Sequence, residues 1–146
     1  MGPEELFVKQ LGGSLRMFVM LFIFTGGMFV ANAHAVTYTD ISALELKKRI
    51  DDSKDKGYIL IDIRTLPEYN AGHIVEATSV PLATLGYRAY SLDKTKDVIA
   101  YCNTGVTSKI ACQILINAGF KDVYNLTGGL QVWPYGLEPT DGRINV

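Results

Sequence analysis

The chain has 146 residues, a net charge of −1, two cysteines and two histidines. This length suits one domain with a short appendage. The near-neutral charge provides no basic footprint for nucleic acid, and so few cysteines and histidines build neither a disulfide framework nor a zinc site. We therefore expect no nucleic-acid partner, no metal and no cofactor.

An apolar run over 17–30 precedes the small-x-small sequence Ala-His-Ala at 33–35. This run fits the apolar region of a secretory signal peptide and falls short of the about 20 residues that a membrane-spanning helix needs. We interpret 1–35 as a signal peptide, or as an N-terminal membrane anchor if it is not cleaved. The mature protein would then be exported, to the periplasm, or be held at the inner membrane.

From residue 36 onward, short apolar runs alternate with amphipathic segments. In chain order we expect a strand over 36–39, a helix over 42–52, a strand over 58–62, a short helix around 67–69, a strand over 78–80, a short helix over 82–91, a strand over 98–101, a helix over 108–119, a strand over 122–125 and a short closing helix over 130–133.

Local signals support these elements. Ser42 and Glu45 have the spacing of a capping box at a helix start. Thr65 caps the helix that follows it, and Pro67 is favoured early in a helix. The run over 58–62 is almost continuously apolar, which is typical of a buried parallel strand. The alternation predicts an α/β domain with a mostly parallel sheet and helices on both faces.

The strand over 98–101 ends at Cys102. After it comes a loop of mostly small or polar residues, namely Asn103, Thr104, Gly105, Val106, Thr107 and Ser108. Unpaired N–H groups of such a loop and of the first helical turn converge on the strand end and favour an anion. We expect them to lower the pKa of the Cys102 thiol from about 8.5 toward ~3.5 to 7.5, and to bind an anionic substrate beside it.

The second cysteine, Cys112, falls on the second turn of the expected helix. At about 1.5 Å rise per residue it lies some 8 Å along the helix axis, whereas a disulfide needs Cα atoms within about 7 Å. We expect two free thiols, with Cys112 in the core. An isolated cysteine is most simply a small buried residue, but the loop and helix after Cys102 favour a nucleophile there.

Several motifs occur in an order and spacing that resemble one known family. They are Ile61-Asp62-Ile63-Arg64, Glu68-Tyr69, Ala71-Gly72-His73-Ile74, the Cys102 loop, and Leu126-Thr127-Gly128-Gly129 ending in Trp133. The chain resembles a single-domain rhodanese. The resemblance implies a three-layer domain over 36–138 with a five-stranded sheet, followed by a C-terminal tail over 139–146.

The resemblance also implies an activity. In rhodaneses the corresponding cysteine takes a sulfane sulfur from a donor such as thiosulfate, forms a persulfide, and passes the sulfur to cyanide or a thiol. It implies that Cys102 is the catalytic residue and that the loop from Asn103 to Ser108 binds the substrate. The expected partners are a small sulfur-containing anion and a thiol or cyanide acceptor.

One departure concerns the loop charge. Many rhodaneses have an arginine at the position of Thr107 or a basic residue near Val106, and this loop has neither. A weaker grip on thiosulfate is expected. Lys109 and Arg88 are candidate replacements for that charge, although each is more simply a surface cation.

The flanking motif residues have simpler structural interpretations. We expect Asp62 and Arg64 to order the end of their strand and to pair with a neighbour such as Glu68. His73, the histidine available to a Cys-His dyad in the mature chain, is expected to be structural. Tyr101 and Trp133 are expected in the core or in a pocket wall.

Other functions stay open at this stage. Without a loop cation, the domain could be a non-catalytic module that binds an anion or a protein partner, or a carrier that delivers sulfur to a specific protein. Phosphatases and arsenate reductases of related fold also use a cysteine loop, but theirs is one residue longer and has an arginine at the position of Ser108. That guanidinium clamps the oxyanion, so we rank this class last.

Overall fold

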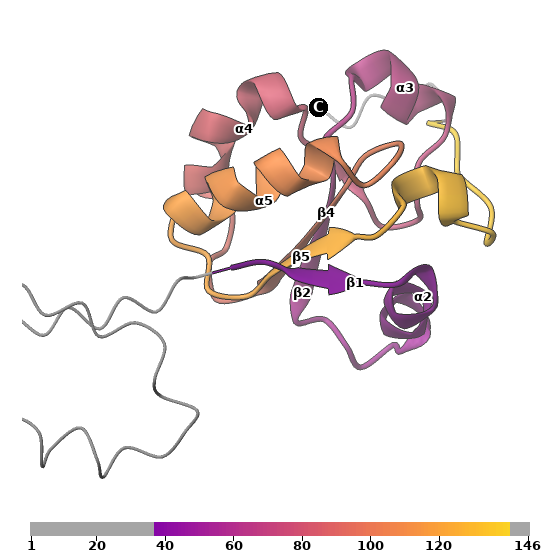
Figure 1. The fold of residues 1–146 in the computed structure, drawn as a ribbon. Helices are drawn as coiled ribbons and strands as arrows, with labels where there is room; N and C mark the ends of the chain where they lie inside the picture. Colours follow the sequence, from indigo (N-terminus) through magenta and orange to yellow (C-terminus); the bar gives the residue numbers. More distant parts are fainter. Residues whose placement is uncertain (1–36, 141–146) are drawn as a thin grey trace, which may run out of the picture. The chain divides into compact units, whose positions relative to one another are not determined.

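The computed structural model describes residues 37–140 (Figure 1). The segment interpreted as a signal peptide or anchor, 1–35, lies outside the described residues, as does the end of the chain from 141 onward. Over the described range, no helix combines the length and the apolar character that crossing a membrane requires.

A five-stranded parallel sheet forms the centre of the domain. Its strands lie in the order β1 (Thr39–Ile41), β5 (Val123–Leu126), β4 (Asp97–Tyr101), β2 (Tyr58–Asp62) and β3 (Thr78–Ser79). The four residues of β4 from Val98 to Tyr101 are completely buried. A strand covered on both faces needs apolar residues at successive positions, and β4, the middle strand of the five, has them.

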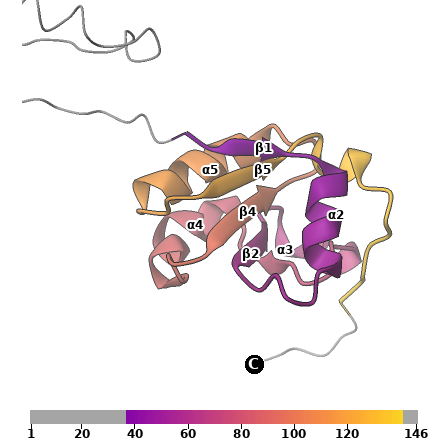
Figure 2. The same cartoon turned by 90° about the horizontal axis from the view of Figure 1, so that it is seen from below.

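Helices cover both faces of the sheet and make three layers (Figure 2). On one face lie α4 (Leu82–Arg88), the 3-10 helix η1 (Ala89–Ser91) and α5 (Thr107–Asn117); on the other lie α2 (Ala43–Asp51), α3 (Leu66–Ala71) and the 3-10 helix η2 (Gly129–Val132). Leu85 and Leu115 are buried under the first group, and Leu46 and Trp133 under the second. The predicted α/β architecture is therefore confirmed.

Two helices begin at the predicted capping signals. At α2 the Glu45 carboxylate accepts a hydrogen bond from the Ser42 N–H (2.9 Å), and the Glu45 N–H donates to Ser42 Oγ (3.2 Å). At α3 the N–H of Thr65 donates to Glu68 Oε2 (3.0 Å). These side chains satisfy N–H groups that a helix start leaves without partners.

The first strand differs from its expected position, 36–39. It runs over Thr39–Ile41, where Asp40 pairs in register with Asn125 of β5 and Ile41 is buried beside it. Aspartate is depleted in strands, so the local pattern gives no reason to extend a strand through it. A side-chain hydrogen bond from Asn125 to Asp40 compensates (2.7 Å), and that partner lies 85 residues away in the sequence.

Candidate functional site

Cys102 directly follows β4, at the carboxyl edge and in the middle of the sheet. The loop after it leads into α5, which begins at Thr107. Carboxyl ends of parallel strands are where ligands bind in open α/β sheets. Only 5 % of Cys102 is exposed, so its sulfur lies at the floor of the loop. Among the other predicted loop residues, Asn103, Thr104, Val106 and Thr107 are exposed, whereas Gly105 and Ser108 are buried.

The Cys102 sulfur contacts both the loop and the start of α5. The N–H of Gly105 lies 3.2 Å from Sγ, and the hydroxyl oxygen of Ser108 lies 3.4 Å from it. The residue at the cap position of α5 is Val106, whose side chain has no acceptor for the first N–H groups of the helix. The Cys102 sulfur therefore accepts hydrogen bonds at the start of α5, as the side-chain oxygen of an N-cap residue does in other helices.

These contacts set the acidity of the thiol. Burial raises the pKa of Cys102, but contact with the Ser108 hydroxyl and hydrogen bonds from the N–H groups of Ser108, Thr104 and Gly105 outweigh it, so the pKa lies below its ordinary value of 9. The direction agrees with the expectation from the sequence. A lowered pKa increases the thiolate fraction at neutral pH, and the thiolate is the nucleophilic form.

The second cysteine has the opposite environment. Cys112 is fully buried in α5, and its Sγ lies 3.5 Å from the carbonyl oxygen of Tyr124. Burial raises the pKa of its thiol to about 12. Both cysteines are free thiols, as predicted, and of the two only Cys102 has a lowered pKa.

The segment that begins at the Gly128-Gly129 turn holds the cysteine loop through backbone hydrogen bonds. The N–H groups of Leu130 and Gln131 donate to the carbonyl oxygens of Cys102 and Asn103, each over 3.0 Å. Gly129 has φ +56, and a Cβ atom there would lie 2.3 Å from the Cys102 carbonyl oxygen. Only glycine allows this left-handed backbone to approach the loop so closely. The Thr-Gly-Gly motif is thus a support for the cysteine peptide.

Arg64 reaches the loop from the end of β2. Its guanidinium binds both carboxylate oxygens of Asp62, with Nη2 at 2.6 Å from Oδ2, and Nη2 also donates to the carbonyl oxygen of Gly72 (2.7 Å). Nη1 lies 3.4 Å from Oδ1 of Asn103. Asp62 and Arg64 order the end of the strand, as expected, but the partner of Arg64 is the completely buried Asp62 and not the suggested neighbour Glu68.

Glu68 instead binds the side chain of Asn103. The Asn103 amide Nδ2 donates to Glu68 Oε1 over 2.9 Å. Sequence reasoning missed this convergence of Arg64 and Glu68 on the loop. The available signal was topological: both residues follow β2, which is hydrogen-bonded to β4, and so both lie at the same sheet edge as Cys102.

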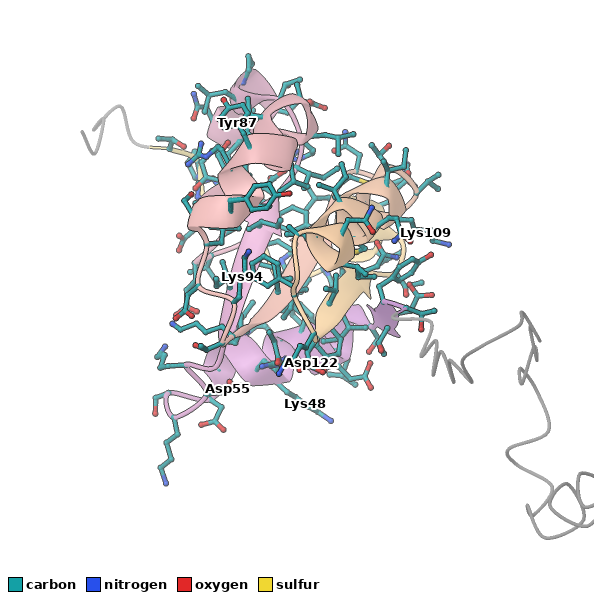
Figure 3. All side chains as sticks on the ribbon, turned by 90° about the vertical axis from the view of Figure 1, so that its left-hand side faces the viewer. Lys48, Asp55, Tyr87, Lys94, Lys109 and Asp122 are labelled. Atoms are coloured by element: carbon teal, nitrogen blue, oxygen red, sulfur yellow. The ribbon has the colours of Figure 1, made fainter. Side chains whose placement is uncertain are left out.

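The two candidate replacement cations do not contact the loop's sulfur site. Lys109 lies on the first turn of α5, is exposed, and points away from the domain (Figure 3). Arg88 is the last residue of α4 and is also exposed. Neither side chain makes an ion pair or a hydrogen bond within 37–140. They behave as surface cations, and Arg64 is the cation in contact with the loop.

The remaining motif residues have structural roles, as predicted. His73 stacks on Tyr69 with ring centroids 3.8 Å apart, and its Nδ1 lies 3.0 Å from the Tyr69 carbonyl oxygen. The buried Tyr101 hydroxyl accepts a hydrogen bond from the N–H of Ile74 (3.1 Å). Trp133 packs in the core and donates its indole N–H to Gly136 (2.9 Å). In the described part of the chain, no three His, Cys, Asp or Glu side chains gather to hold a metal.

Comparisons with known proteins agree with this geometry. The family model described as "Rhodanese-like domain" matches residues 42–134. The chain is 34% identical over 108 residues to the thiosulfate sulfurtransferase GlpE of Coxiella burnetii, covering 74% of this chain and 98% of that protein.

Solved structures give the same result for the fold. A rhodanese-like domain protein from Staphylococcus aureus superposes with a TM-score of 0.63 at 30% identity, covering 69% of this chain and 97% of that one. The rhodanese-like domain of the Anabaena sp. Alr3790 protein has a TM-score of 0.65 at 30% identity, covering 75% and 86% of the two chains. The chain belongs to the rhodanese-like domain family.

Proposed function

We propose that the protein is a sulfurtransferase that carries sulfur as a persulfide on Cys102. The observation that carries this proposal is the environment of Sγ, which accepts N–H hydrogen bonds at the start of α5 and has a lowered pKa. The name of the Coxiella burnetii relative, thiosulfate sulfurtransferase, supports thiosulfate or a similar anion as the donor.

The reaction has two balanced steps. The Cys102 thiolate attacks the sulfane sulfur of thiosulfate; a new S–S bond forms, the original S–S bond breaks, and sulfite leaves with the electron pair. A nucleophile, cyanide or a thiolate, then attacks the outer sulfur of the persulfide and releases the Cys102 thiolate. No metal or redox cofactor is required by this balance, because each step is a displacement at sulfur.

The loop residues have distinct roles in this proposal. The N–H groups of Thr104, Gly105 and Ser108 stabilise the negative charge on sulfur, which is the task of an oxyanion hole in other enzymes. Asn103, Val106 and Thr107 form the exposed rim against which the donor binds. Because none of these three side chains carries a positive charge, we expect a high KM for thiosulfate. We expect better turnover with a sulfur donor that binds through contacts other than its negative charge.

Intact mass spectrometry of the protein before and after thiosulfate, then after cyanide, tests the proposal. The expected result is a mass increase of one sulfur atom that cyanide discharges, present in the wild type and in Cys112→Ser and absent in Cys102→Ser. Failure of thiosulfate, a polysulfide and a persulfide alike to load Cys102 would overturn it and favour a non-catalytic binding module.

Export is proposed on the sequence of 1–35 alone. Expression of the full chain with a C-terminal tag, followed by fractionation and N-terminal sequencing, tests it. A periplasmic product that begins at Val36 supports a cleaved signal peptide. A membrane-bound product that retains residue 1 supports an anchor, and a cytoplasmic product contradicts both.

A further inference from the structure

A chain of side-chain contacts connects the nucleophile to the edge of the sheet. Cys102 Sγ lies 3.4 Å from Ser108 Oγ, which donates to Asn125 Oδ1 over 2.6 Å. Asn125 Nδ2 in turn donates to Asp40 Oδ1 over 2.7 Å. Ser108 and Asn125 are completely buried, whereas Asp40 is exposed on the edge strand β1. We call these three residues, Ser108, Asn125 and Asp40, the serine array.

Asp40 determines which way the serine array points. An ionised carboxylate only accepts hydrogen bonds, so the Asn125 NH₂ group must face Asp40 and its carbonyl oxygen must face Ser108. The register of β1 and β5 keeps Asp40 and Asn125 opposite each other. The hydroxyl of Ser108 has one hydrogen, and the short contact of 2.6 Å shows that it is directed to Asn125.

This direction conflicts with the needs of a thiolate. A neutral thiol donates its own hydrogen to a lone pair of Ser108, but a thiolate sulfur only accepts. To stabilise the thiolate, Ser108 must turn its hydrogen from Asn125 to sulfur and leave a buried carbonyl oxygen without a donor, which is unfavourable. Rotation of the Asn125 amide would restore a donor to Ser108, but it would place the amide oxygen against the Asp40 carboxylate.

We propose that Asp40 is a positioning residue that, through Asn125, restrains the Ser108 hydroxyl and thereby limits the ionisation of Cys102. This inference rests on the proposed function only in taking Cys102 as the nucleophile. A partly restrained thiol is less nucleophilic at rest and is also oxidised more slowly, because oxidation proceeds through the thiolate.

Other ionisable groups approach the Cys102 loop from different elements. They are Asp62 and Arg64 after β2, Glu68 on α3, Tyr101 on β4, and Lys109 and Cys112 on α5. Arg64 and Glu68 act on Asn103, on the loop's exposed rim. None of these residues belongs to the serine array, but the charge of Asp40 contributes to the raised pKa of Cys112, so alkylation of Cys112 is followed separately in the Asp40 variants.

The test is the rate of Cys102 alkylation by iodoacetamide as a function of pH, measured on the full chain. Peptide mapping distinguishes Cys102 from Cys112, and no sulfur donor is needed, so the result is independent of the sulfur-transfer activity. In Asp40→Asn the Asn125 amide can rotate, because the new amide donates to its oxygen; the Asn125 NH₂ group then faces Ser108 Oγ and frees the Ser108 hydrogen for the sulfur. We expect the midpoint of the pH profile to fall by about one pH unit.

A double-mutant cycle separates this mechanism from simple charge removal. Ser108→Ala is expected to raise the midpoint, and Asp40→Asn is expected to have no further effect in that background. A purely Coulombic influence of Asp40 would persist without the hydroxyl. Asp122→Asn is the matched control, because it removes the same charge just before the first residue of β5, whereas Asn125 lies near its end, and its midpoint is expected to equal that of the wild type.

A second route keeps the inference testable if Ser108→Ala does not fold. Asn125→Ala removes the acceptor of the Ser108 hydrogen, so it is expected to lower the midpoint as Asp40→Asn does, and to make Asp40→Asn silent. An unchanged midpoint in Asp40→Asn, or an equal fall with and without the array, would overturn the proposal.

Discussion

The N–H of Leu130 donates to the carbonyl oxygen of Cys102 over 3.0 Å, so the peptide that carries the nucleophile is held by the segment after β5. This hydrogen bond depends on the glycine turn that precedes it. The position of the sulfur therefore depends on two loops that are distant in the sequence, the one that begins at Cys102 and the turn at 127–129, whose first residues are 25 positions apart.

Gly129→Ala is expected to destabilise the domain and abolish sulfur transfer. The added Cβ would meet the Cys102 carbonyl oxygen at 2.3 Å in a left-handed backbone conformation. Gly136→Ala is the matched control, because Gly136 also has a positive φ (+82) but no atom lies within 4 Å of its added Cβ. We expect Gly129→Ala to cost at least about 2 kcal/mol more in urea unfolding. Equal losses in the two variants would contradict a role for close approach.

Arg64→Leu is expected to lower the free energy of unfolding by about 3 kcal/mol or more. The substitution leaves the completely buried Asp62 carboxylate without its bidentate partner, and an unpaired buried charge is costly. Adding Asp62→Asn should recover part of the loss, because it removes that charge. Urea unfolding of the four proteins of this cycle measures the coupling, and strictly additive losses would count against a coupled pair.

Glu68→Gln is expected to loosen the loop in a pH-dependent way. Hydrogen bonds from the Thr65 hydroxyl, the Asn103 amide and the Thr65 N–H lower the pKa of Glu68 from 4.5 to about 2. A folded-state pKa below the unfolded value stabilises the fold above 4.5, and this contribution is lost as the pH falls toward about 2. The Tm difference between the wild type and Glu68→Gln should therefore be present at neutral pH and vanish over that interval.

The matched control for Glu68 is Asp93→Asn. Hydrogen bonds from Thr95 also lower the pKa of Asp93, but this residue lies in the turn before β4, at the opposite end of the strand from Cys102. It should change acid stability without changing the rate of sulfur transfer. If Glu68→Gln also leaves the rate of sulfur transfer unchanged, the hydrogen bond between Glu68 and Asn103 is dispensable for that rate.

The two cysteines of one sample are expected to be alkylated over different pH ranges. Alkylation of Cys102 should reach half its maximal rate below pH 9, since its pKa is lowered, whereas the pKa of Cys112 is raised to about 12 by burial. Peptide mapping of the native and urea-unfolded protein measures both. Cys112 should react appreciably only after unfolding, and equal native rates would contradict the proposed difference in environment.

Much of the fold follows from local sequence signals. The Ser42 and Glu45 capping box, the apolar run of β2 and the strand-loop-helix around Cys102 each depend on neighbouring residues, and each is found as predicted. The first strand was placed too early, because Asp40 is tolerated there only through a contact with a residue 85 positions away. Local patterns contain no information on such a partner.

The same limit applies to the candidate site. The lowered pKa of Cys102 was predictable, since a cysteine between a strand and a helix start lies close to the unpaired N–H groups of the loop and of the first helical turn. The partner of Arg64 was not, because Asp62 and Glu68 are both within reach in sequence and only their burial decides between them. The contact of Asn125 with Ser108 was not predictable either, because it depends on how α5 packs on the sheet.

The burial of Cys112 also bears on how the protein recovers from oxidation of Cys102. The chain has two cysteines, and Cys112 is buried with its thiol beside the Tyr124 carbonyl. Because burial raises the pKa of Cys112 to about 12, its thiol is a poor nucleophile at neutral pH and is not prepared to resolve a sulfenic acid formed at Cys102. Reduction of such a sulfenic acid then calls for an external thiol, which under the proposed function is also the class of molecule that accepts sulfur from Cys102.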